Sequence, residues 1–147
     1  MMKILLLMAL VLVENSGCVP HATGPPFSQL EGPETGKVVV YLYLANRTSV
    51  AHRIFADDLL ITKLMPYSYY RYVTVPGQIT FSLATTRTQD RVIVRALPGS
   101  TYFIEHRHIE IPTLLGAGAD YDLVPRDQES ALPALQGLRL IVPSDWQ

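Results

Sequence analysis

Short apolar runs, each ending in turn-forming residues, dominate the chain from residue 37 onward. The first run, at 38–44, reads Val-Val-Val-Tyr-Leu-Tyr-Leu and contains no charged position, so it predicts a strand buried on both faces. Later runs are of similar length and are rich in β-branched and aromatic residues. We expect further strands at 51–55, 59–64, 69–75, 79–85, 91–97, 101–109, 121–124 and 138–142.

The turns between these runs recur about every ten residues, which is typical of an antiparallel all-β sandwich or a partly closed barrel. Asp57-Asp58 predicts an acidic hairpin turn. Pro76-Gly77 and Pro98-Gly99 suit type II turns, because proline presets φ at the first central position and glycine accepts a positive φ at the second. We expect one mainly antiparallel β-sandwich-like domain over residues 37–142, followed by a tail at 143–147.

One short C-terminal helix is predicted within this domain. Ala, Leu and Leu at 131, 132 and 135 form an apolar stripe, Asp127 or Ser130 can cap it, and Gly137 can end it. Pro133 is tolerated only in a first turn, so we expect the helix to begin near Ser130. Residues 111–120 contain Pro112 and two glycines, and we expect a mobile loop there.

Residues 19–36 carry four prolines and three glycines among polar residues and have no apolar period. This composition predicts a flexible linker at 18–36, in which Phe27 and Leu30 could dock on the domain or on a partner.

The first 17 residues have the layout of a secretory signal peptide, with Lys3 before an apolar run at 4–13. This run is too short to cross about 30 Å of hydrocarbon. The chain then reaches Cys18, its only cysteine, which rules out an intramolecular disulfide or a multi-cysteine zinc site.

Gly17-Cys18 resembles the cleavage box of bacterial lipoproteins, in which the cysteine sulfur is lipidated and the cysteine becomes the first residue. Asn15 stands where such boxes usually have an aliphatic residue. The alternative to lipidation is an ordinary signal peptide followed by a free thiol at Cys18. Val19 in place of Asp, by resemblance to enterobacterial sorting patterns, points to the outer membrane facing the periplasm. We expect a protein tethered to the cell envelope by acyl chains such as palmitate on Cys18.

The domain also resembles a family of bacterial lipoproteins known as domain of unknown function 2846, over roughly residues 36–140. The resemblance implies a β-sandwich-like envelope domain and implies no activity. Asp58 stands where the family usually has Gly, and Pro133 interrupts its usual helix. The matching features are Gly36-Lys37 before the strand at 38–43, Asp57-Asp58, Tyr69-Tyr70 leading to Pro76-Gly77, Gly99 to Phe103, and an acidic helical segment after Leu123.

The net charge and the sequence motifs argue against several classes of function. The formal net charge is −1, with no basic surplus to attract nucleic acid. No Gly-x-Ser-x-Gly elbow occurs, and Gly116-Ala117-Gly118 lacks the Lys-Ser/Thr of a phosphate loop. We therefore expect neither an enzyme nor a bound cofactor.

His106 and His108 are weak metal-ligand candidates, because residues two apart in a strand lie on one face and could share a metal with Glu110. The alternative is that Glu105 to His108 form an exposed cross-strand charge ladder, which is the more common role of such a sequence.

Four tyrosines, Tyr67, Tyr69, Tyr70 and Tyr72, precede the first Pro-Gly turn and could offer an aromatic platform to a sugar or a protein. Tyrosine also simply suits half-buried strands. Three functional hypotheses remain. The first is an interaction or structural module that binds another envelope protein, and the second is a binder of cell-wall glycan or a small ligand that uses these tyrosines and the loop at 114–119. The most remote is a metal-dependent enzyme at the two histidines.

Overall fold

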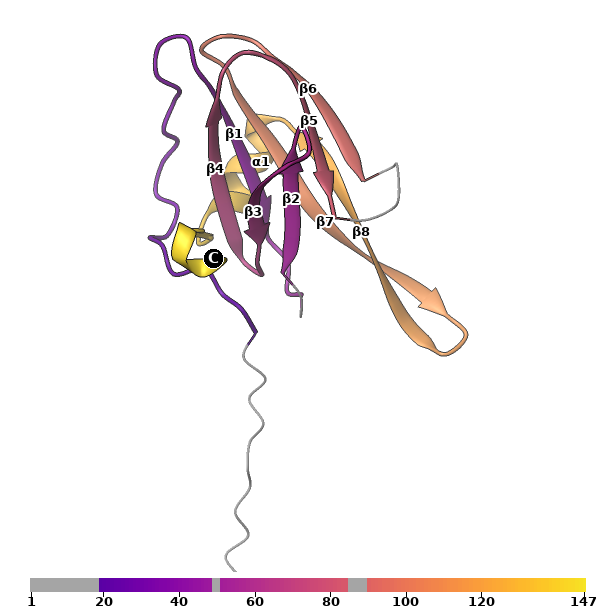
Figure 1. The fold of residues 1–147 in the computed structure, drawn as a ribbon. Coiled ribbons are helices and arrows are strands. Elements are labelled where there is room, and N and C mark those ends of the chain that lie inside the picture. The colour runs from indigo at the N-terminus through magenta and orange to yellow at the C-terminus, as the bar shows by residue number, and fades with distance from the viewer. Residues whose placement is uncertain (1–18, 49–50, 85–89) are drawn as a thin grey trace, which may run out of the picture.

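The computed structural model describes residues 19–48, 51–84 and 90–147, which form two packed β-sheets, one short α-helix and one turn of 3₁₀ helix at Pro143–Asp145 (Figure 1). The five-stranded sheet has the order β8-β7-β1-β4-β9 and the four-stranded sheet has the order β3-β2-β5-β6. The expected all-β, mainly antiparallel fold is confirmed, and of the two architectures considered it is the sandwich. The strands are β1 (Val38–Leu44), β2 (His52–Ala56), β3 (Leu59–Leu64), β4 (Ser68–Thr74), β5 (Gly77–Leu83), β6 (Arg91–Ala96), β7 (Thr101–Thr113), β8 (Gly116–Arg126) and β9 (Arg139–Leu140).

Strand β1 lies in the middle of the five-stranded sheet, antiparallel to β4 and parallel to β7. All seven of its residues are buried, as its uniformly apolar sequence predicts. Val40 and Leu42 face the four-stranded sheet and belong to the main core. Tyr41 and Tyr43 point to the opposite face, where a second, smaller core forms. The strand therefore stabilises both layers of the molecule.

The four-stranded sheet supplies the other half of the main core through strict alternation. In β6, Val92 and Val94 are buried whereas Arg91, Ile93 and Arg95 are exposed. Because side chains of a strand alternate between its faces, this period of two turns one face of the sheet toward β1 and the other toward solvent.

The second core is covered by two segments, the helix α1 (Gln128–Leu135) and the stretch that was expected to be a flexible linker. That stretch packs along β9 and does not behave as a free stalk. The Phe27 N–H donates to the Leu138 carbonyl at 2.7 Å, and the Leu140 N–H donates to the Pro25 carbonyl at 3.0 Å. Prolines lack a donor but still accept hydrogen bonds, so a proline-rich segment can lie along a strand edge without forming a regular strand.

Phe27 fixes this segment to the sheet. Its ring packs edge-on against Tyr69, with centroids 5.5 Å apart, and against Tyr41, with centroids 6.2 Å apart. Gly24 lies so close to Leu140 that a Cβ atom there would collide with the backbone. Docking of Phe27 on the domain, one of the two roles expected for it, is therefore the observed one.

Two of the three expected turns have the expected geometry. Asp57 and Asp58 both have positive φ, at 46° and 66°, and close the β2–β3 hairpin. Gly99 has φ 74°, and the Ser100 N–H donates to the Leu97 carbonyl at 3.2 Å, as a type II turn requires. The third, at Gly77, has φ 138° and carries the chain from β4 in one sheet to β5 in the other, so the type II prediction there is wrong.

The helix begins earlier than expected. Asp127 is the N-cap, and its carboxylate accepts a hydrogen bond of 2.7 Å from the Ser130 N–H. Pro133 consequently lies inside the helix, and the prediction of a start near Ser130 is wrong. The helix has eight residues, and Pro133 removes one internal hydrogen bond close to its C-terminal end. Gly137, with φ 80°, follows the end of the helix.

The largest departure from expectation concerns residues 111–120. They form no loop but the outer half of a long hairpin, in which β7 pairs with β8 without a break from Phe103 opposite Arg126 to Thr113 opposite Gly116. Figure 1 shows this hairpin projecting beyond the rest of the sandwich. Continuous pairing supplies hydrogen bonds to residues that local sequence alone assigns to a loop.

Candidate functional site

Three histidines and one tyrosine gather at the end of the sandwich from which the hairpin projects. His106 and His108 come from β7 and lie on one face, because they are two residues apart in a strand. Tyr121 lies opposite His108 on β8. His52 begins β2 and reaches them from the four-stranded sheet. The sequence indicates the first two as candidate site residues, and no local pattern points to His52 or Tyr121.

The four rings form one contiguous stack. His52 and His106 lie face to face, with centroids 4.6 Å apart and planes 4° from parallel. Tyr121 approaches His52 at 4.1 Å with its ring inclined by 62°, and it stacks on His108 at 5.1 Å. Aromatic contacts therefore join the two sheets where the main core ends.

Burial favours the neutral form of His52 and His106. His106 is fully buried, and neither of its ring nitrogens has a hydrogen-bond partner among the described residues. Burial, with a smaller contribution from the charge of His52, lowers the pKa of His106 to about 4. Burial and the nearby His108 also lower the pKa of His52. At neutral pH, the His52 and His106 rings are therefore uncharged.

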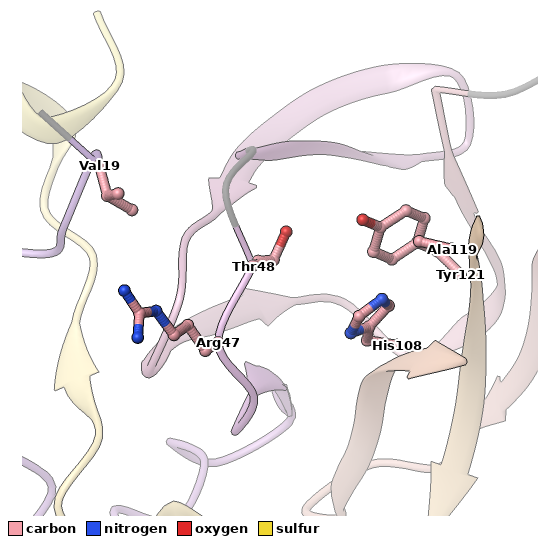
Figure 2. Close-up of a pocket in the computed structure, with 6 residues that line it drawn as sticks. All are labelled: Val19, Arg47, Thr48, His108, Ala119 and Tyr121. Carbon is pink, nitrogen blue, oxygen red and sulfur yellow. The ribbon is translucent and has the colours of Figure 1, made fainter. Parts of the chain in front are cut away.

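Two hollows flank Tyr121. One, of about 290 Å³, lies between the hairpin and the chain segments around Val19 and Arg47. Figure 2 shows the His108 and Tyr121 rings pointing into it from the hairpin side, with Thr48 facing them. The other, of about 350 Å³, is lined by His52, Arg53, Leu83, Ala84, Ala51 and Tyr121. These hollows combine apolar walls with arginine and imidazole groups, which suits a small ligand with a polar or anionic end.

The geometry does not favour a metal centre. In the described parts of the chain, no group of three or more His, Cys, Asp or Glu side chains is placed to hold a metal ion. His52 and His106 contact each other through their ring faces, whereas metal ligands must aim nitrogens at a common point. Glu110, the carboxylate considered as a third ligand, is exposed.

The charge-ladder interpretation holds for the other face of β7 and is wrong for the histidines. Arg107 forms an ion pair of 2.6 Å with Asp122, and Glu105 forms one of 2.6 Å with Arg126. These side chains lie on the face of the sheet that carries α1. His106 points the opposite way, into the core, because alternation in a strand separates residues 105 and 107 from residues 106 and 108.

The four tyrosines do not form a shared platform. Tyr69 is buried against Phe27 on the helix side of the sheet. Tyr70 and Tyr72 pack against the main core on the opposite side. Only Tyr67 is exposed, at 51%. A period of two splits residues that are close in sequence between two faces, so the predicted aromatic surface is absent from this part of the sheet.

The tip of the β7–β8 hairpin is the most exposed apolar feature of the described residues. Leu114 and Leu115 form its turn and are 105% and 101% exposed, and Ile111 beside them is 41% exposed. Residues 111–119 contain no charged side chain.

Cys18 lies outside the described residues, but its neighbour Val19 is described. Val19 is 43% exposed and lines the first hollow together with His108 and Ala119. The chain therefore enters the domain beside the base of the hairpin. Within residues 19–48, 51–84 and 90–147, no helix is long and apolar enough to span a membrane.

No known protein family, curated protein or solved structure matches the chain.

Proposed function

We propose that this chain is an exported bacterial lipoprotein, anchored through Cys18 to the envelope and most consistent with an outer-membrane position facing the periplasm. The signal-peptide layout of residues 1–17 and the Gly17-Cys18 box support the anchor. The packing of residues 23–32 on the domain limits the distance between the domain and the membrane. Only a few residues separate the lipid from the folded body, so the body would sit close to the membrane surface.

Its proposed role is that of a non-catalytic interaction or structural module that binds another envelope protein. The observation that carries this proposal is the edge strand β6 of the four-stranded sheet, which presents Ile93 with 62% exposure. A partner can bind such an edge by adding a strand to the sheet. Membership of the family known as domain of unknown function 2846 also remains a proposal.

A second candidate function is binding of a small ligand or of cell-wall glycan at the same end of the molecule. The two hollows on either side of Tyr121 favour it, because Arg47, Arg53 and His108 line them with groups that can donate hydrogen bonds. The tyrosine cluster at 67–72 no longer supports this candidate, since its members face different ways.

In-cell crosslinking followed by affinity capture and mass spectrometry tests the proposal. The native chain is compared with Cys18→Ala, which keeps the folded domain and removes the lipidation site. We expect one abundant envelope protein to be captured with the native chain and to be lost or weakened with Cys18→Ala. A matched third variant, Ile93→Ser, should reduce capture without affecting folding, because this side chain is exposed.

A different set of results would favour the second candidate. No crosslinked protein, combined with retention on isolated cell wall or with a co-purifying small molecule, would contradict the interaction module. Substituting Tyr121 by Ala should then reduce that retention, since this ring contributes to both hollows.

A further inference from the structure

We propose that the tip of the β7–β8 hairpin inserts into the surface of the membrane that holds the lipid anchor, and so fixes the orientation of the domain. This inference rests on the proposed anchor at Cys18. It assigns a ligand class, the headgroup and upper acyl region of a bilayer, to the side chains of Leu114, Leu115 and Ile111.

The composition of the tip is not explained by its backbone. Two-residue turns usually take Gly, Asn or Asp, which suit their dihedral angles. Here the turn residues are Leu114 and Leu115, and neither packs on the domain, since both are fully exposed. Exposed leucines stabilise neither the turn nor the core, so their contribution is to a contact outside the chain.

The position of the tip agrees with a membrane contact. The chain enters the domain at Val19, which lines the same hollow as Ala119 and His108 at the base of the hairpin. Val19 directly follows the proposed anchor residue, so the described chain begins at the end of the domain that carries the hairpin. Figure 1 shows the hairpin projecting from the end of the sandwich at which the indigo start of the described chain lies.

The length of the uncharged tip matches the depth of a membrane interface. Residues 111–119 carry no charge, and Glu110 and Asp120 border them on the two strands. From Glu110 to Leu114 is four residues, or about 13 Å of strand. Interfacial elements bury their apolar side chains about 5–10 Å into the boundary between headgroups and acyl chains. The leucines can therefore reach this boundary while both carboxylates stay in the headgroup region or in water.

Pairing satisfies the inward-facing backbone groups of the tip. The hydrogen-bonded register continues to Thr113 opposite Gly116, and the outward-facing groups of the two strands can bond to water and lipid headgroups at the interface. Glycine and alanine at 116–119 keep the β8 side of the tip narrow. An unpaired loop of the same composition would carry a much larger desolvation cost.

Site-specific fluorescence on the full, lipidated chain in vesicles tests this inference. Leu115→Cys is labelled with an environment-sensitive fluorophore, while the lipid on Cys18 blocks the only native thiol. The vesicles contain phosphatidylethanolamine and phosphatidylglycerol, with or without bromine on the acyl chains. The matched control is Leu97→Cys, which is 64% exposed at the opposite end, next to the turn where Gly99 bonds to Lys37.

We expect the label at 115 to shift to shorter wavelength and to be quenched several-fold more strongly by brominated lipid than the label at 97. Equal, water-like spectra at both positions would overturn the inference. A blue shift at 115 that brominated lipid does not quench would also overturn it, because the tip would then contact protein.

The mass of the N-terminal peptide, measured on the same sample, separates the two proposals. A lipidated Cys18 with an unquenched tip refutes membrane insertion alone. An unlipidated Cys18 refutes the anchor and the inference that rests on it.

Discussion

The rings of His52 and His106 stack face to face, with centroids 4.6 Å apart, and join β2 of the four-stranded sheet to β7 of the five-stranded sheet. Protonation of both rings would weaken the contact, because two imidazolium charges at this distance would repel each other in a partly dry environment. The packing of the two sheets at the hairpin end is therefore coupled to proton binding.

We predict that the protein loses stability as the pH falls from about 6.5 to about 4. The pKa of His106 is about 4 in the folded chain and 6.5 in a model peptide, so the unfolded chain takes up the proton first. The contribution of His106 is complete above pH 6.5 and disappears as the pH approaches 4, a loss of about 3 kcal/mol. Urea unfolding at a series of pH values measures it.

The variant His106→Phe separates this effect from general acid denaturation. Phenylalanine keeps an aromatic ring in the stack and removes two buried nitrogens that have no partner among the described residues. We expect it to be at least as stable as the native chain at pH 7 and to lose less stability toward pH 4. An unchanged pH dependence would show that the neutral stack is not the cause.

Packing of the N-terminal segment on the domain is tested by Phe27→Ala. This change removes a buried ring that contacts Tyr41 and Tyr69, and it should lower the free energy of unfolding by about 3 kcal/mol. Limited proteolysis should then cut within residues 19–36 at native conditions. The matched control, Ser28→Ala, alters an exposed neighbour and should change neither quantity. Equal protease sensitivity of all three chains would mean that the segment is free in solution.

We predict different effects on stability for glycine substitutions at the two aspartates of the β2–β3 turn. Asp58 has φ 66°, which costs an L-residue more than it costs glycine, so Asp58→Gly should stabilise the protein by about 0.5–1 kcal/mol. Asp57 has φ 46°, but its carboxylate also accepts a hydrogen bond of 2.9 Å from the Thr80 N–H. Asp57→Gly loses that bond and should not stabilise. Thermal unfolding of both variants distinguishes them, and equal shifts would contradict this explanation.

The sequence was sufficient to predict elements whose local pattern agrees with their final environment. The seven apolar residues of β1 and the alternation of β6 both indicate their burial correctly. Asp57-Asp58 and Pro98-Gly99 likewise predict their turns, because the required dihedral angles restrict the residue types.

The remaining features depend on contacts between distant residues. Residues 111–120 look like a loop, yet pairing between β7 and β8 makes them a hairpin. Residues 19–36 look like a linker, yet Phe27 finds a site between Tyr41 and Tyr69. His52 is 54 residues from His106, and no local pattern indicates that they touch.

The identity of the N-terminal residue in the membrane fraction tests the central claim most directly. Mass spectrometry of the N-terminal peptide of the native chain should show a mature protein that begins at Cys18 and carries a diacylglyceryl group on its sulfur, with the first 17 residues removed. A free Cys18 thiol, or a mature chain that begins at another residue, would contradict the anchor and the orientation proposed for the hairpin.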